Sequence, residues 1–235
     1  MKESANLSLL LIPYLTITGA LYHISYWQTF DLNGLEFISI TDIIKSSVYP
    51  ILSTLFLIIC GNIFFLFTDP FGFYASDGEG ANTKVGKFVN TSLGIKLSLF
   101  IWIIFLSLFF IFDLNTGRWY MFGTFASVPP AIILYNSDIL IGTVKSLKLR
   151  YLMFQILVYL PVFAYATGKY EGETIFRNSK YKYIEKLSKN KLKVDTLKFL
   201  GNTDKYFILS NLKNSEIIYL KSDKIDTLIV KTKKY

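Results

Sequence analysis

The sequence predicts an α-helical integral membrane bundle of four spans, or alternatively five, followed by a small all-β cytosolic domain of about six antiparallel strands. Hydrophobic residues make up 52% of the 235 residues and charged residues only 18%, whereas soluble domains hold about 25% charged residues. The net charge of +8 lies entirely after residue 168, because residues 1–168 contain nine basic and nine acidic residues, and residues 169–235 contain sixteen and eight. We therefore divide the chain into a transmembrane helical domain at 1–168 and a basic β-rich domain at 169–235.

Long windows without Asp, Glu, Lys or Arg predict the spans, because a bilayer core about 30 Å thick needs roughly 20 apolar residues in a helix. The windows place segments near 5–28, 44–68, 92–113, 119–136 and 150–168. The fourth segment contains Pro129 and Pro130, and a proline pair interrupts helical hydrogen bonding. We expect that segment to be re-entrant, interfacial or broken. Four spans place the N-terminus in the cytoplasm and five place it outside; we favour four.

Basic residues directly after the last apolar window set the orientation. Lys169, Arg177, Lys180 and Lys182 follow it within a short stretch, and cytoplasmic flanks of membrane helices are enriched in Lys and Arg. The C-terminal domain is therefore expected in the cytoplasm.

Short runs rich in Tyr, Phe, Ile and Thr predict the strands of the C-terminal domain. They lie near 172–177, 180–185, 194–200, 205–210, 215–220 and 225–231. Lys180-Tyr181-Lys182-Tyr183 alternates strictly, which predicts the lysines on one face of a strand and the tyrosines on the other. A module of this size is marginally stable alone, so we expect it to pack on the membrane domain, on another copy in a homo-oligomer, or on both.

The sequence lacks the usual signatures of catalysis and metal binding. One Cys and one His provide neither an intramolecular disulfide nor the four soft ligands of structural zinc. No Gly-rich phosphate loop, HExxH or GxSxG motif is present, and a hydrolytic triad would have to use His23. We therefore expect no enzyme, no cofactor and no metal site.

The basic β-rich domain contains the principal candidate binding site. Lysines interleaved with tyrosines are suited to anionic lipid headgroups, a nucleotide or nucleic acid. The candidate ligand-binding residues are Lys180, Lys182, Lys198, Tyr181 and Tyr183. The alternative is that these lysines serve only as the orientation signal.

Three polar residues are candidates within the helical domain, because ionisable or amide groups in a membrane often have a function. They are His23, Asn62 and Lys96. The alternatives are an interfacial histidine, an amide that joins two helices, and a lysine that marks a helix end.

Several residues also match a pattern known from other proteins. Tyr26-Trp27-x-x-Phe30, Asp42-Ile43-Ile44-Lys45 and Tyr49-Pro50 resemble a pattern in small uncharacterised bacterial polytopic membrane proteins that end in a β-rich tail. This resemblance implies a location in the bacterial inner (plasma) membrane and no particular activity. The overall architecture also looks like that of anti-phage effectors in which a cytosolic β-barrel senses a cyclic nucleotide and helices disrupt the membrane.

Our first interpretation is a non-enzymatic bacterial inner-membrane protein that presents a basic β-module to the cytoplasm to bind or sense an anionic partner. The alternatives are a membrane-disrupting defence effector gated by a nucleotide, and a channel or transporter subunit. The expected partners are the lipid bilayer, further copies of the chain, an anionic lipid or nucleotide, and a protein partner encoded nearby.

Overall fold

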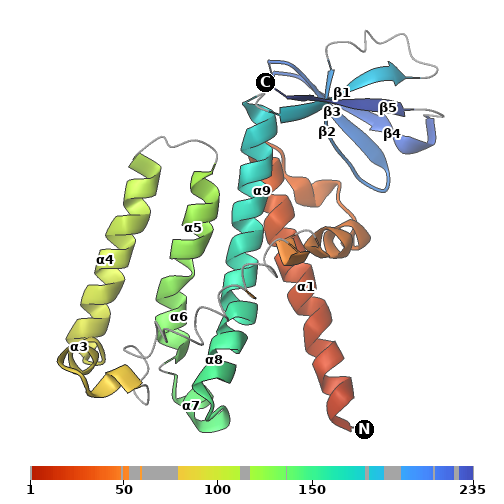
Figure 1. Ribbon diagram of the computed structural model, residues 1–235. Coiled ribbons are helices and arrows are strands. Elements are labelled where there is room, and N and C mark those ends of the chain that lie inside the picture. Colours follow the sequence, from red (N-terminus) through yellow and green to blue (C-terminus); the bar gives the residue numbers. More distant parts are fainter. Residues whose placement is uncertain are drawn as a thin grey trace. The chain divides into compact units, whose positions relative to one another are not determined.

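The computed structural model describes residues 2–48, 50–52, 59, 79–111, 117–135, 137–177, 180–187, 197–213, 215–224 and 228–234 (Figure 1). The chain forms two compact units, one of Met1–Val48 with Thr167–Tyr235 and the other of Tyr49–Ala166. This division differs from a boundary at residue 168, because the N-terminal helix belongs to the same unit as the C-terminal sheet.

The unit at Tyr49–Ala166 is helical in its described part. Its elements are η2 (Glu79–Asn82), α3 (Lys84–Val89), α4 (Ser92–Ile111), α5 (Arg118–Ala126), α6 (Val128–Tyr135), α7 (Asp138–Thr143), α8 (Leu147–Phe154), the π-helical turn η3 (Gln155–Tyr159) and the first residues of α9 (Leu160–Phe176). A break at Ser127 separates α5 from α6. Pro129 and Pro130 then lie in the first turn of α6, where a helix does not use the missing backbone N–H groups.

The predicted four-span bundle is wrong. Among the described residues, one helix is long and apolar enough to cross a membrane, and it runs over Leu152–Phe176. The apolar part of α4, Ser92–Leu108, is shorter than a span requires, and 119–136 is divided between two short helices. Most of the predicted segment 44–68 lies outside the described residues. Charge-free windows measure apolar length, but they do not show whether a helix is continuous.

The other unit contains α1 (Lys2–Gln28), the short turn η1 (Gly34–Glu36), a helical segment at 40–48 and the last part of α9. Helix α9 approaches α1 closely at Gly168 and Gly172. A Cβ at Gly168 would overlap the Ser25 hydroxyl and the Tyr22 carbonyl oxygen, and a Cβ at Gly172 would lie 2.7 Å from Thr29 Oγ1. These two glycines, four residues apart, form the small-residue contact that lets helix backbones approach each other.

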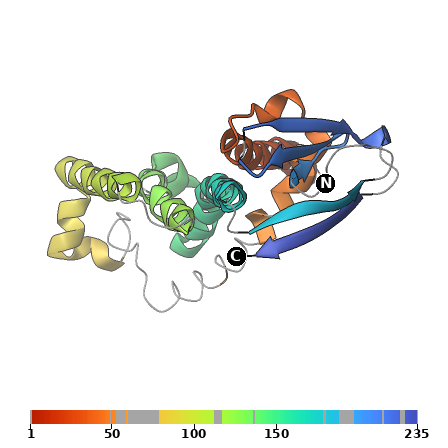
Figure 2. The same ribbon diagram turned by 90° about the horizontal axis from the view of Figure 1, so that it is seen from above.

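The C-terminal sheet has five antiparallel strands in the order β4-β3-β2-β1-β5. They are β1 (Lys180–Leu187), β2 (Leu197–Asn202), β3 (Tyr206–Asn211), β4 (Ile217–Lys221) and β5 (Leu228–Lys234), and Figure 2 shows β1 beside β5. The predicted six strands are thus too many, because 172–177 continues α9 instead of forming a strand. The Glu173–Arg177 pair, 3.6 Å apart and four residues apart in sequence, supports that last helical turn.

The core of this unit joins the end of α1 to one face of the sheet. Tyr26, Trp27 and Phe30 are buried together with Leu200 and Ile208. The Trp27 ring fits tightly, because a Cβ at Gly34 would lie 2.6 Å from its Cδ1 and a Cβ at Gly201 would lie 3.2 Å from its Cη2. The aromatic residues at the end of α1 therefore form a protein core. A second cluster lies around Ile184, Leu197 and Leu209.

Candidate functional site

The start of β1 presents two lysines outward. Lys180 and Lys182 are exposed, whereas Tyr181 is buried and Tyr183 is half-buried. The register pairs Lys182 with Phe199 of β2 and with Thr232 of β5. Because alternate residues of a strand share a face, the two lysines lie about 7 Å apart on the face opposite Tyr181, as the alternation predicts. We call Lys180, Lys182 and the exposed Thr232 the lysine face.

Lys198 has a different environment from the other two candidate lysines. Its side chain is completely buried, its Nζ donates a hydrogen bond to the Ile175 carbonyl oxygen at 3.4 Å, and it lies 5.9 Å from the centre of the Tyr181 ring. Lys198 therefore caps the last turn of α9, where lysine complements the unpaired carbonyls and the negative end of the helix dipole.

Burial lowers the pKa of Lys198 from 10.5 to about 8, because desolvation disfavours the charged ammonium. The five predicted ligand-binding residues differ in exposure. Lys180 and Lys182 are accessible to a partner, Tyr183 is half-buried, and Lys198 and Tyr181 lie within the fold.

Of the three polar candidates of the helical domain, His23 and Lys96 lie within the described residues, each in a different compact unit. His23 Nδ1 accepts a hydrogen bond from Trp27 Nε1 at 3.3 Å, which stabilises one turn of α1. Lys96 is exposed on α4. Asn62 lies outside the described residues.

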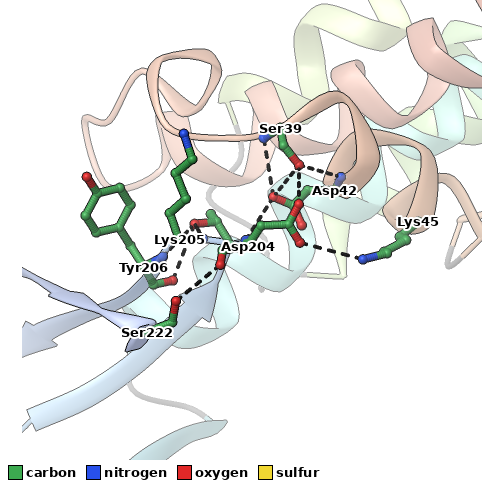
Figure 3. A network of polar contacts seen from close by, with 8 residues as sticks. Ser39, Asp42, Lys45, Asp204, Lys205, Tyr206 and Ser222 are labelled. Carbon is green, nitrogen blue, oxygen red and sulfur yellow. Dashed lines mark hydrogen bonds and ion pairs between the residues drawn. The ribbon is translucent and has the colours of Figure 1, made fainter. Parts of the chain in front are cut away.

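A polar cluster that the sequence analysis missed connects the sheet to the helical segment 40–48; we call Ser39, Asp42, Lys45 and Asp204 the Ser39 junction (Figure 3). The Ser39 hydroxyl donates to Asp204 Oδ2 at 2.7 Å, and the Asp204 backbone N–H donates to Asp42 Oδ2 at 3.2 Å. Lys45 Nζ lies 3.6 Å from Asp204 Oδ1. The junction thereby fixes the β2–β3 turn onto the first turn of the segment.

The local signal for this junction is a capping box. Ser39 Oγ accepts from the Asp42 backbone N–H at 3.1 Å, and the Asp42 carboxylate accepts from the Ser39 backbone N–H at 3.3 Å. The pattern S-x-x-D at 39–42 resembles the S/T-x-x-E/Q box, and the helix begins at residue 40. The contact with Asp204 has no local signal in the sequence.

The charged groups of the Ser39 junction are two carboxylates and one ammonium. The hydrogen bond from Ser39 and the nearby Lys45 ammonium hold the pKa of Asp204 below its usual value of 3.8, against a smaller opposing effect of desolvation. In the described part of the chain, no group of three or more His, Cys, Asp or Glu residues is arranged to hold a metal ion. We therefore interpret the junction as a structural joint between helix and sheet.

Comparison of the chain with protein-family models, with curated protein sequences and with solved structures gives no match.

Proposed function

We propose that the protein is a membrane-anchored, non-enzymatic binding protein whose lysine face binds phosphate groups at a membrane surface. The observation that carries the proposal is the short connection between the candidate span and the lysines. The candidate span ends at Phe176, its last turns contain Lys169, Glu171 and Glu173, and β1 begins with the exposed Lys180. A helix whose apolar part crosses the bilayer places these charged last turns and both lysines on the headgroup side.

The exposed apolar surface of α4 also supports attachment to a membrane. The large hydrophobic side chains exposed on this helix are Leu93, Leu97, Phe100, Ile101, Ile103, Ile104, Phe105, Leu108 and Ile111. They form one broad face of the helix, while Ile95, Leu99, Trp102 and Leu106 on the other side are half-buried. An apolar surface of this extent is unusual on a protein surrounded by water. Lipid contact accounts for it without further partners.

The direction of insertion follows from the charges. Anionic lipids make the cytoplasmic leaflet negative, and each Lys near that surface contributes about 1 kcal/mol to binding. The proposed location is thus the bacterial inner membrane with the β-module in the cytoplasm. Phosphate chemistry is shared by lipid headgroups and soluble nucleotides, and the experiment below distinguishes these two sources.

Ligand-induced stabilisation of the full-length protein in neutral detergent tests the proposal. Thermal unfolding is measured with phosphatidylglycerol, phosphatidylcholine, inorganic phosphate or ATP added, because a ligand that binds the folded state raises the melting temperature. We expect phosphatidylglycerol to stabilise the wild type more than phosphatidylcholine does. Stabilisation by ATP instead assigns the lysine face to a soluble nucleotide and overturns the lipid assignment.

The decisive variant is the double substitution Lys180→Glu with Lys182→Glu. Loss of two lysines at about 1 kcal/mol each weakens binding by roughly 30-fold or more. The matched control is Lys213→Glu with Lys221→Glu, which changes the charge equally at two exposed positions. Lys221 lies on β4 and Lys213 just before it, and β4 is an edge strand separated from β1 by β3 and β2. Equal responses of both variants would contradict the proposal.

A further inference from the structure

We infer that the helical segment 40–48 is an interfacial lipid-binding element, whose Ile40, Ile44 and Val48 contact the acyl chains of the bilayer. The inference goes beyond the lysine face, which binds headgroups, and it rests on the membrane attachment proposed above.

The first observation is an exposed apolar stripe. Ile40, Ile44 and Val48 are spaced four residues apart, so they lie on one face of the helix. Their exposed fractions are 69%, 38% and 51%. Of the four aliphatic side chains of the segment, three are thus turned outward and Ile43 alone is buried.

The second observation is that the opposite face buries two serines beside Ile43. Ser46 and Ser47 are buried, and their hydroxyls donate to the carbonyl oxygens of Ile43 and Ile44 at 2.8 and 2.6 Å. A helix of a protein in water usually places apolar residues inside and polar residues outside. In hydrocarbon, by contrast, polar groups must find partners within the protein.

The helix that packs against this segment also buries polar side chains and exposes apolar ones. Thr18 and Ser25 of α1 are fully buried, and they donate to the carbonyl oxygens of Tyr14 and Tyr22 at 3.0 and 2.9 Å. Three large apolar residues of the same helix are exposed, namely Leu11, Ile12 and Ile17. A Cβ at Gly19 would overlap the Ile43 carbonyl oxygen, so the two backbones meet here.

The polar boundary of the stripe favours lipid as the occupant over a second protein. The segment begins at the Ser39 junction, where Lys45 keeps most of its side chain exposed while it pairs with Asp204. A lysine that extends to the polar side of an apolar stripe is typical of helices at a membrane interface. The stripe therefore continues from the headgroup level into the acyl region.

Spin-label accessibility measures the surroundings of the stripe directly. A Cys60→Ser background leaves no other cysteine, and Ile44→Cys then places a nitroxide on the stripe of the full-length protein in phosphatidylglycerol-containing nanodiscs. The matched control is Lys205→Cys, an exposed position in the β-module. If Ile44→Cys does not fold, Val48→Cys provides a second label on the same face.

We expect the label at 44 to collide more with oxygen, which concentrates in lipid, than with a water-soluble nickel chelate, and the label at 205 to show the opposite preference. High nickel accessibility at 44 would place the stripe in water, and low accessibility to both reagents would place it under protein. Either result overturns the inference.

Carbonate extraction separates the two proposals. Protein that is retained in the membrane but has a nickel-accessible label at 44 contradicts only this inference. Release of the protein from the membrane contradicts the membrane attachment itself.

Discussion

The Tyr26 hydroxyl donates a hydrogen bond to the backbone carbonyl of Leu200, a residue that bulges from the ladder between β2 and β3. The register passes from Phe199 paired with Leu209 to Gly201 paired with Ile208, so Leu200 has no partner in that ladder. The bond therefore ties α1 to the sheet at a point where a backbone acceptor would otherwise be buried unpaired.

Tyr26→Phe is expected to lower the free energy of unfolding by about 1–3 kcal/mol, because it leaves the buried Leu200 carbonyl without its donor. Tyr183→Phe is the matched control, since Tyr183 is only half-buried in the neighbouring strand. Denaturant unfolding of both variants in detergent checks the difference. Equal stability of the two variants would show that the bond contributes nothing.

Gly168→Ala is expected to destabilise the protein by about 1–3 kcal/mol, the usual range for overpacking. The new methyl group would overlap Ser25 and the Tyr22 carbonyl oxygen, whereas a Cβ at Gly142 would meet no atom within 4 Å. Gly142→Ala therefore serves as the control, and helix propensity favours it slightly. The prediction fails if both alanine variants melt at the wild-type temperature.

Ser39→Ala is expected to lower the free energy of unfolding by about 1 kcal/mol, because the helix loses its N-cap. The substitution also removes the contact to Asp204. A double-mutant cycle with Asp204→Asn isolates that contact, because the two side chains are 2.7 Å apart. We expect a non-zero coupling energy in the cycle. Asp223→Asn, a nearby exposed acidic residue, should give none with Ser39→Ala, and additive effects in both cycles would argue against the junction.

Lys198 predicts a specific pH dependence of stability. Its pKa is about 8 in the folded protein and 10.5 when unperturbed, so the unfolded state binds more protons between these values. The free energy of unfolding should therefore rise with pH across that window through this residue. Lys198→Met removes the titrating group, and subtracting the two pH profiles isolates its contribution. A difference that falls or stays flat above pH 8 would contradict the assignment.

The sequence was informative where the structural rule is local. Alternation in Lys180-Tyr181-Lys182 follows from the two-residue period of a strand, and the structure places the lysines outward and Tyr181 inward. The strand predicted at 172–177 was wrong, because the contact of Gly172 with α1 and the continuing helix override the strand propensity of Thr174 and Ile175.

Such local rules do not predict long-range contacts. The burial of Lys198 depends on the end of α9 lying above β2, and the contact between Ser39 and Asp204 joins residues that are 165 positions apart. Composition showed that the helices are apolar, and the proline pair indicated that 119–136 is interrupted, as the break at Ser127 confirms. The buried serines of the segment 40–48 become visible only in three dimensions.

Energy transfer from the lysine face to the bilayer surface tests the central claim most directly. Thr232 is exposed and lies opposite Lys182 in the register, so a donor dye on Thr232→Cys, in the Cys60→Ser background, reports on this face with both lysines intact. With acceptor dyes on the lipid headgroups of nanodiscs, we predict greater transfer in phosphatidylglycerol than in phosphatidylcholine, and loss of the difference on adding Lys180→Glu with Lys182→Glu. Equal transfer in the two lipids with both lysines present would contradict the claim that this face binds the anionic membrane surface.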